Sequence, residues 1–257
     1  MKILFFGRKS VGADALAYLS TLHNVEVVGV LTDNHLSVSP TYVEATRQGL
    51  TVFSFDEARE AIHKGNLSYD LGLSMLYWRK LGIEFIEEPI LGTINFHPAP
   101  LPEYKGTGGY NLAILEGLSE WAVSAHYVDD KIDTGDIISV NRFPIDSERE
   151  TVVSLERTCR DKLLYTFKTV VNRVLTEGKL QCFPNVGGHY TSRAQMEAMK
   201  EIRPGDDIER KIRAFWFPPY DGAYITMGGK KYTLVCEQIL QQLADPDASS
   251  LFTTNCR

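Results

Sequence analysis

The sequence has few cysteines. It contains four in 257 residues, at Cys159, Cys182, Cys236 and Cys256, and they stand far apart. No C-x-x-C pair is present, so the pattern favours neither a zinc site nor a disulfide framework. We therefore expect reduced thiols.

Long apolar runs and an excess of positive charge are also missing. The apolar run before Gly7 is too short for the core of a signal peptide or for a membrane span. The formal net charge is −6, which argues against nucleic acid as the main partner. We expect a soluble, cytoplasmic protein with a small-molecule substrate and neither a membrane nor a nucleic-acid partner.

What is present is an ordinary globular composition, with 44% hydrophobic and 23% charged residues. Short apolar or β-branched runs alternate with segments of helical periodicity, which indicates strands alternating with helices. The strand-like runs are "KILFFG", "VEVVGVLTD", "TVFSF", "YDLGLSML" and "GTINF". This order predicts an α/β, Rossmann-like, doubly wound and mostly parallel sheet.

The second half of the chain predicts a long closing helix and a small extension. Residues 150–177 carry an apolar stripe at helical spacing. Beyond it, "PGDDIERKIRAF" is typical of a capped helix, and "GAYITM", "GGK" and "KYTLVCEQIL" of a β-hairpin. We expect a catalytic domain over 1–180, a linker over 181–205, the C-terminal helix and hairpin over 206–245, and a frayed tail over 246–257.

One candidate site lies in "INFHPAPLPEYKGTGGYN", residues 94–111, where an apolar run meets turn residues. Asn95 and His97 are two apart on a predicted strand, so their side chains point to the same side. An amide donor and an imidazole together can hold an oxyanion and move a proton, as acyl transfer requires. The alternative is that His97 caps the strand and Asn95 bonds the local backbone.

A second candidate is the acidic turn "DDKIDTGDI", with Asp129, Asp130, Asp133 and Asp136. These carboxylates can be solvated turn residues, or part of a metal site without matching ligands elsewhere, or one of them can orient His97. Spacing alone leaves the three alternatives open.

Two further segments carry weaker signals. "GRKSVG", residues 7–12, is a glycine turn before a helix, which fits either an anion site or a solvated turn. "RAFWFPPYDGAYI", residues 213–225, is rich in aromatic residues that either pack in the core or stack on a ligand ring.

Read together, "INFHPAPLPEYKGTGGYNLAILEG" and "SAHYVDDKIDTGDII" resemble the formyltransferases that use 10-formyltetrahydrofolate. The resemblance runs from the first strand to about residue 180. It implies a formyltransferase with 10-formyltetrahydrofolate as formyl donor, no metal, and a catalytic trio of Asn95, His97 and Asp133. In related enzymes a substrate amine attacks the formyl carbon and a tetrahedral intermediate forms. Tetrahydrofolate then departs from that intermediate.

The resemblance also implies the two ligand-binding regions. The pterin is expected against "SMLYWR" and the loop from Asp129 to Asp133, at Met75, Leu76, Tyr77, Trp78, Asp129 and Ile132. The amine substrate is expected on the side of "GRKS" and "YKGTGG", at Arg8, Lys9, Ser10, Lys105, Gly108, Gly109, Tyr110 and Asn111, together with Trp216.

Four acceptors occur among such enzymes: initiator methionyl-tRNA, glycinamide ribonucleotide, a nucleotide-linked amino sugar and water. Residues 201–257 carry seven Lys or Arg against eight Asp or Glu, which disfavours a tRNA-binding extension. The "HPAPLPEY", "GGYN" and C-terminal aromatic motifs are most similar to nucleotide-sugar N-formyltransferases, in which the tail commonly forms a homodimer. In such an enzyme Arg8, Lys9 and Lys105 are suited to meet a pyrophosphate.

The expected reaction is therefore formylation of the 4-amino group of a 4-amino-4,6-dideoxy sugar carried on dTDP. Its biological role would be surface polysaccharide synthesis, as in lipopolysaccharide O-antigen. The alternatives are a GDP or UDP carrier, methionyl-tRNA or glycinamide ribonucleotide as acceptor, and a non-catalytic module that binds folate or nucleotide.

Overall fold

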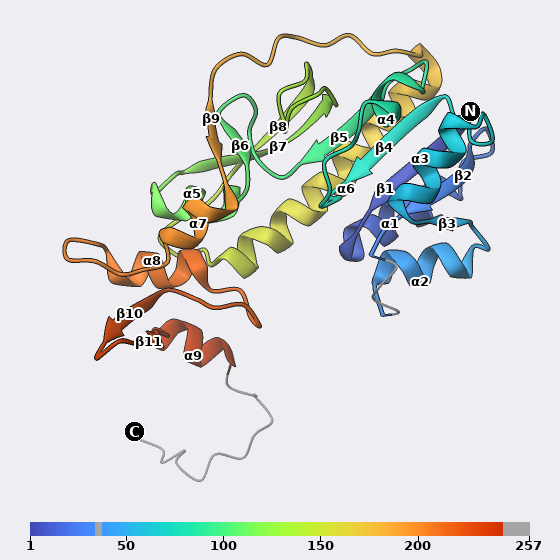
Figure 1. Cartoon of the computed structure of the whole chain (residues 1–257). Coiled ribbons are helices and arrows are strands. Elements are labelled where there is room, and N and C mark those ends of the chain that lie inside the picture. The colour runs from blue at the N-terminus through green and yellow to red at the C-terminus, as the bar shows by residue number, and fades with distance from the viewer. Residues whose placement is uncertain (34–37, 244–257) are drawn as a thin grey trace, which may run out of the picture.

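A seven-stranded sheet forms the centre of the molecule (Figure 1). The computed structural model describes residues 1–33 and 38–243. The strand order is β3-β2-β1-β4-β5-β7-β8, with β1 to β5 parallel and β7 and β8 antiparallel to their neighbours. The bounds are β1 Lys2–Gly7, β2 Glu26–Leu31, β3 Val52–Phe53, β4 Leu71–Met75, β5 Thr93–His97, β7 Glu120–Tyr127 and β8 Ile137–Pro144. The predicted α/β, mostly parallel fold is confirmed.

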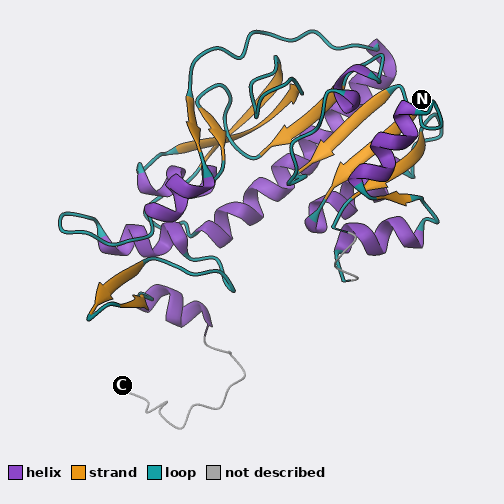
Figure 2. Cartoon of the chain, viewed as in Figure 1, coloured by secondary structure: helices purple, strands orange, loops and turns teal. Residues whose placement is uncertain are grey.

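Helices cover both faces of the sheet (Figure 2). In β1, Ile3 and Phe5 belong to one buried cluster, whereas Leu4 and Phe6 belong to the other. The first cluster includes residues of α1 (Lys9–Leu19), α2 (Pro40–Arg47) and α6 (Val152–Glu177), and the second those of α3 (Phe55–His63) and α4 (Glu84–Glu87). Burial on both faces explains why this strand is apolar from Ile3 to Phe6 rather than alternating.

The long helix α6 matches its predicted pattern. It begins after Thr151, whose hydroxyl accepts a hydrogen bond from the backbone N–H of Ser154 in a capping box. The predicted apolar stripe is buried along its length, at Val152, Leu155, Cys159, Leu163, Phe167, Val170, Val171 and Val174. Phe167 packs edge-on against Phe5 with ring centroids 6.3 Å apart, which anchors α6 to the sheet.

After α6 the chain runs back along the molecule to β9 (His189–Thr191), which pairs with β6 (Tyr104–Gly106) (Figure 1). α7 (Arg193–Ala198) follows, so residues 181–205, expected as a linker, contain two regular elements. The division into domains stays a prediction.

The predicted C-terminal extension is present, with one difference. α8 (Ile208–Phe215) contacts α5 (Gly109–Leu115), and β10 (Tyr224–Met227) and β11 (Lys230–Thr233) form the hairpin. The expectation that "KYTLVCEQIL" continues as strand is wrong, because β11 ends at Thr233 and α9 (Glu237–Leu243) begins soon after. The predicted tail, 246–257, lies outside the described residues.

None of the helices within residues 1–33 and 38–243 combines the length and the apolar character that crossing a membrane requires.

Candidate active site

Three adjacent strands place polar side chains next to one another near their ends. Asn95 of β5 pairs in register with Ser74 of β4 and with His126 of β7. The Ser74 hydroxyl donates to Asn95 Oδ1 at 2.8 Å, which fixes the orientation of the amide. His126 Nδ1 lies 2.7 Å from the carbonyl of Tyr127 and donates to it, so His126 Nε2 accepts from Asn95 Nδ2 at 3.1 Å. Asn95 is thus held from both sides.

His97 ends β5 and is 6% exposed. Its Nε2 lies 2.9 Å from the carbonyl oxygen of Tyr104, which can only accept, so Nε2 carries a hydrogen. In the neutral ring Nδ1 is then unprotonated. That atom lies 3.5 Å from Asp133 Oδ2, so the ring presents its basic nitrogen beside a carboxylate.

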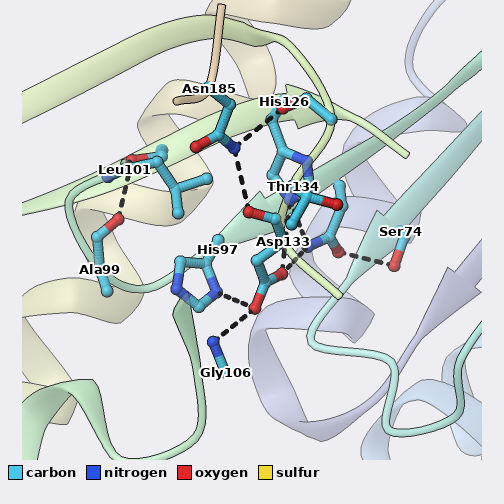
Figure 3. Close-up of polar contacts among 12 residues, drawn as sticks. Ser74, His97, Ala99, Leu101, Gly106, His126, Asp133, Thr134 and Asn185 are labelled. Atoms are coloured by element: carbon cyan, nitrogen blue, oxygen red, sulfur yellow. Dashed lines mark hydrogen bonds and ion pairs between the residues drawn. The ribbon is translucent and has the colours of Figure 1, made fainter. Parts of the chain in front are cut away.

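Asp133 lies between the two histidines (Figure 3). Its Oδ2 accepts the backbone N–H of Gly106 at 2.9 Å, and its Oδ1 is 3.5 Å from both His126 Nε2 and Asn95 Nδ2. Burial raises the pKa of Asp133. His97 in its protonated form, a contact with protonated His126 and the Gly106 N–H stabilise the carboxylate, outweigh burial and hold this pKa well below its usual value. Asp133 is therefore ionised at neutral pH.

Asn185 supports the Asp133 turn from a segment distant in sequence. Its Nδ2 donates to the carbonyls of Asp133 at 3.0 Å and Gly135 at 2.9 Å. The side chain comes from the stretch between α6 and β9, which passes beside the turn (Figure 3). The loop that carries the aspartate is thus fixed by a side chain outside the two recognised motifs.

Two pockets meet at Asn95 and Asp133, which line both. The small pocket, about 130 Å³, is bounded also by Trp78, Leu81, His126, Val128 and Ile132. The large pocket, about 620 Å³, is bounded also by Arg8, Lys9, His97, Arg193, Phe217 and Tyr220. His126 faces only the small pocket and His97 only the large one, so two ligands can meet at one polar centre.

Most of the predicted binding residues line these pockets. The small pocket contains Tyr77, Trp78, Asp129 and Ile132. The large pocket contains Arg8, Lys9, Leu76, Tyr77, Trp78, Gly108, Tyr110, Asn111 and Ile132. Asn111 also donates its amide to the carbonyl of Ala214 at 2.6 Å, which ties α5 to α8.

Five predicted residues line neither pocket: Met75, Ser10, Gly109, Lys105 and Trp216. Met75 is fully buried in the core, and Trp216 is partly buried and packs against the core. The expectation that Lys105 meets a pyrophosphate needs correction. Its ammonium is buried and donates to the carbonyls of Gly187 at 2.7 Å and Asn185 at 3.3 Å.

The backbone of the large pocket has unusual conformations. Within residues 1–33 and 38–243, the non-glycine residues with positive φ are Lys9, Leu76 and Asp133, at 60°, 54° and 55°. All three line the large pocket. Such conformations cost free energy and gather at functional sites, which supports the large pocket as a functional site.

The large pocket carries basic side chains that differ in their partners. Arg8 pairs with Asp33 at 3.3 Å, Lys9 with Glu156 at 3.2 Å, and Lys200 with Glu197 at 2.8 Å. The side chain of Arg193, by contrast, has no hydrogen bond or ion pair with any residue that the structure describes. Its guanidinium is therefore available to an anionic ligand.

An aromatic pair stands on the same pocket. The rings of Phe217 and Tyr220 are stacked, with centroids 5.8 Å apart and an interplanar angle of 21°. Tyr220 is 61% exposed, so one aromatic face is open to a ligand ring. The aromatic segment singled out in the sequence therefore reaches the site through Phe217 and Tyr220, whereas Trp216 lines neither pocket.

Sequence patterns missed several contributors to this site. Ser74 and His126 lie within strands that read as apolar, although His126 stands inside the motif "SAHYVDD". Asn185, Arg193 and Lys200 come from the segment expected to be a linker and carry no local signal. Only the register of β4, β5 and β7, together with the path of the chain after α6, brings them to the site.

The doubly wound α/β sheet carries two pockets that meet at Asn95 and the ionised Asp133, with His97 beside them, an arrangement suited to transferring a group between two bound ligands. Residues 1–171 match the formyl transferase family, and the chain belongs to this family. It is a formyltransferase, and the family uses 10-formyltetrahydrofolate as its formyl donor. Among the described residues, no group of three or more His, Cys, Asp or Glu is placed to hold a metal ion.

Curated relatives include the methionyl-tRNA formyltransferase of Bacillus mycoides, which is 28% identical over 245 residues that cover 90% of this chain and 76% of the relative. The methionyl-tRNA formyltransferase of Listeria innocua is 26% identical over 245 residues, covering 91% and 78%.

Solved structures confirm the fold. An N-formyltransferase from Helicobacter canadensis, in complex with folinic acid and dTDP-3-aminofucose, has a TM-score of 0.71 at 23% identity and covers 90% of this chain and 86% of its own. A 4-N formyltransferase from Francisella tularensis has a TM-score of 0.77 at 21% identity and covers 92% and 97%.

Proposed function

We propose that this formyltransferase acts on a nucleotide-linked amino sugar, at the 4-amino group of a 4-amino-4,6-dideoxy sugar carried on dTDP. The product would serve surface polysaccharide synthesis, including O-antigen. The observation that carries the proposal is the large pocket, which joins basic side chains and a stacked aromatic pair to His97. A nucleoside diphosphate needs cations for its phosphates and a flat surface for its base.

The small pocket is the proposed site of the pterin of the formyl donor. Trp78, Leu81, Val128 and Ile132 supply apolar surface for a flat pterin ring, and Trp78 is 55% exposed. Arg79, Lys80 and Lys131 line the same pocket and suit the carboxylates of the glutamate that every folate carries. Bound there, 10-formyltetrahydrofolate would supply the activated formyl carbon where Asn95 and Asp133 separate the pockets.

In this proposal His97 handles the proton. Its Nδ1 is unprotonated in the neutral ring, and the residue lines the large pocket, where the acceptor amine would enter. When Nδ1 takes the proton of the attacking amine, the imidazolium lies beside the ionised Asp133 at 3.5 Å, which stabilises the charge. The Tyr104 carbonyl holds the other nitrogen and keeps the ring in this orientation.

Asn95 would donate to the formyl oxygen. One hydrogen of its amide is engaged by His126 Nε2 at 3.1 Å. The other points toward Asp133 Oδ1 at 3.5 Å, a long and weak contact that a developing oxyanion can replace. Ser74 keeps the amide oxygen turned away, so the nitrogen faces the reacting atoms.

The acceptor would lie along the large pocket. Arg193 and Lys200 of the α7 region, with Arg8 and Lys9 at the start of α1, are suited to the phosphates. Tyr220 would stack on the nucleobase from the C-terminal side. The sugar would then extend between these groups toward His97.

A homodimer through the C-terminal hairpin and α9 is part of the proposal. Met227, Tyr232 and Leu240 are exposed there, at 55%, 45% and 56%, and give this small extension an apolar surface. Such surface favours association. Light scattering of the purified protein should give twice the chain mass, and a monomer at micromolar concentration would contradict this part of the proposal.

Methionyl-tRNA is the second candidate acceptor, because curated sequence relatives include methionyl-tRNA formyltransferases. Residues 201–257 carry seven basic against eight acidic residues, which makes a poor surface for neutralising tRNA phosphates. The charge therefore favours the nucleotide sugar.

The test mixes the enzyme and 10-formyltetrahydrofolate with a panel of nucleotide-linked 3-amino and 4-amino sugars on dTDP, GDP and UDP. Mass spectrometry should detect addition of one formyl group to a dTDP-linked 4-amino sugar. A formylated 3-amino sugar would correct the position, and no formylated sugar at all would reject the proposal.

A further inference from the structure

A third hollow adjoins the small pocket on its outer side. This outer groove, about 680 Å³, is lined by Phe55, Arg59, His63, Arg79, Lys80 and Ile83, among others. Arg79, Lys80 and Leu81 line both hollows, so the outer groove continues directly from the small pocket. It lies over α3 and the segment between β4 and α4, away from the large pocket.

The basic groups of the outer groove are partly fixed and partly free. The Arg79 guanidinium lies over the Phe55 ring, 3.8 Å from its centroid, which holds it where the two hollows join. The side chains of Lys80 and His63 have no hydrogen bond or ion pair with any described residue. Arg59 pairs with Asp56 at 2.9 Å on the helix surface. Glu84 and Asp130 also line the groove, beside the basic side chains of Arg59, Arg79 and Lys80.

We propose that the outer groove binds the γ-linked glutamyl chain of a folate that carries more than one glutamate. The inference rests on the proposed use of the small pocket for the formyl donor. Each added γ-glutamate brings one carboxylate on a short aliphatic spacer, which matches cations set among Phe55, Ile83 and Ile86. A chain leaving the small pocket passes Arg79 and Lys80 first and reaches Arg59 and His63 next.

This arrangement predicts an order of effects. The first glutamate already contacts Arg79 and Lys80, so replacing those residues should weaken the binding of every folate. Arg59 lines the outer groove but not the small pocket, so it should affect only folates with a longer chain. Because Arg59 is half-exposed, we expect an effect of only a few fold from this residue.

The experiment measures equilibrium binding of 5-formyltetrahydrofolate with one and with three glutamates by titration calorimetry on the full chain. At low salt we expect the triglutamate to bind about five- to tenfold more tightly, with the advantage shrinking as salt screens the charges. Arg59→Gln should reduce the triglutamate's advantage in affinity to about two- to threefold and leave monoglutamate binding unchanged.

Arg47→Gln is the matched control, because Arg47 also pairs with an acidic residue three positions away on a helix but lies on α2. Equal affinities for the two folates, or a triglutamate advantage that persists unchanged in Arg59→Gln, would overturn the inference. Failure of the proposed function is distinguishable, because it would appear as normal monoglutamate binding without formylation of any nucleotide sugar.

Discussion

His97 Nδ1 lies 3.5 Å from Asp133 Oδ2, while Nε2 of the same ring donates to the carbonyl of Tyr104 at 2.9 Å. The histidine is therefore held with its basic nitrogen beside an ionised carboxylate. Such a pair is set to take up a proton in a low-dielectric pocket and to release it afterwards.

Replacement of His97 tests this assignment. His97→Asn should lower kcat by at least about a hundredfold, because general base catalysis contributes that much or more. Binding of 5-formyltetrahydrofolate should change little, since His97 faces only the large pocket. Steady-state kinetics measure kcat, and titration calorimetry measures folate binding. Turnover close to that of the unchanged enzyme would remove His97 from the mechanism.

Asp133 should give a pH-dependent contribution to stability. Its pKa is lowered in the folded protein from an unfolded value of about 3.9, so folding favours the ionised form. The stabilisation is fully present above that unfolded value and is lost as the pH falls through the lowered pKa.

We therefore expect Asp133→Asn to reduce the free energy of unfolding by about 1–3 kcal/mol at pH 7. The difference from the unchanged protein should shrink as the pH falls below about 4. Urea titrations at several pH values measure this, and a difference that stays constant down to pH 3 would show that ionisation is not its source.

Gly106 is predicted to be intolerant of a side chain. Its φ is +85°, and a Cβ there would lie 2.4 Å from the carbonyl oxygen of Thr191. Gly106→Ala should strain the backbone and separate β6 from β9, displacing the N–H that Asp133 accepts. We expect a loss of about 2 kcal/mol in the free energy of unfolding and a lower kcat.

Gly178→Ala is the matched control for Gly106→Ala. Gly178 has a φ of +75°, but nothing lies within 4 Å of the added Cβ. It should cost about 1–3 kcal/mol from backbone strain alone, because φ +75° with ψ −133° suits only glycine, and leave kcat unchanged. Equal kinetic effects of the two substitutions would contradict a role for the Gly106 N–H in holding Asp133.

Much of the fold follows from the sequence because it depends on local periodicity. The apolar strands and the α6 stripe repeat at the spacings of strand and helix, and Asn95 and His97 stand where a strand ends. Residues 181–205 have neither spacing, so β9, α7 and the side chains of Asn185 and Arg193 depend on long-range packing. The burial of Lys105 could not be predicted for the same reason, because the carbonyl groups that accept its hydrogen bonds belong to that segment.

Arg193 is predicted to contribute to acceptor binding. It lines the large pocket without a partner among the residues described, so its guanidinium should pair with a phosphate. Arg193→Gln should raise KM for the nucleotide sugar by about tenfold or more and change kcat less, because a charged hydrogen bond is worth about 1.5–3 kcal/mol. Arg142→Gln is a suitable control, because Arg142 is an exposed arginine that pairs with Glu103 and Glu120 outside both pockets. Equal KM values for the two variants would contradict a phosphate site at Arg193.

The most direct test of the proposed function is the ratio of kcat/KM for a dTDP-linked 4-amino-4,6-dideoxy sugar to that for initiator methionyl-tRNA, measured with one enzyme preparation and one formyl donor. The basic and aromatic groups of the large pocket, together with the acidic balance of residues 201–257, predict a ratio well above one. A ratio below one, with efficient formylation of the tRNA, would contradict the account.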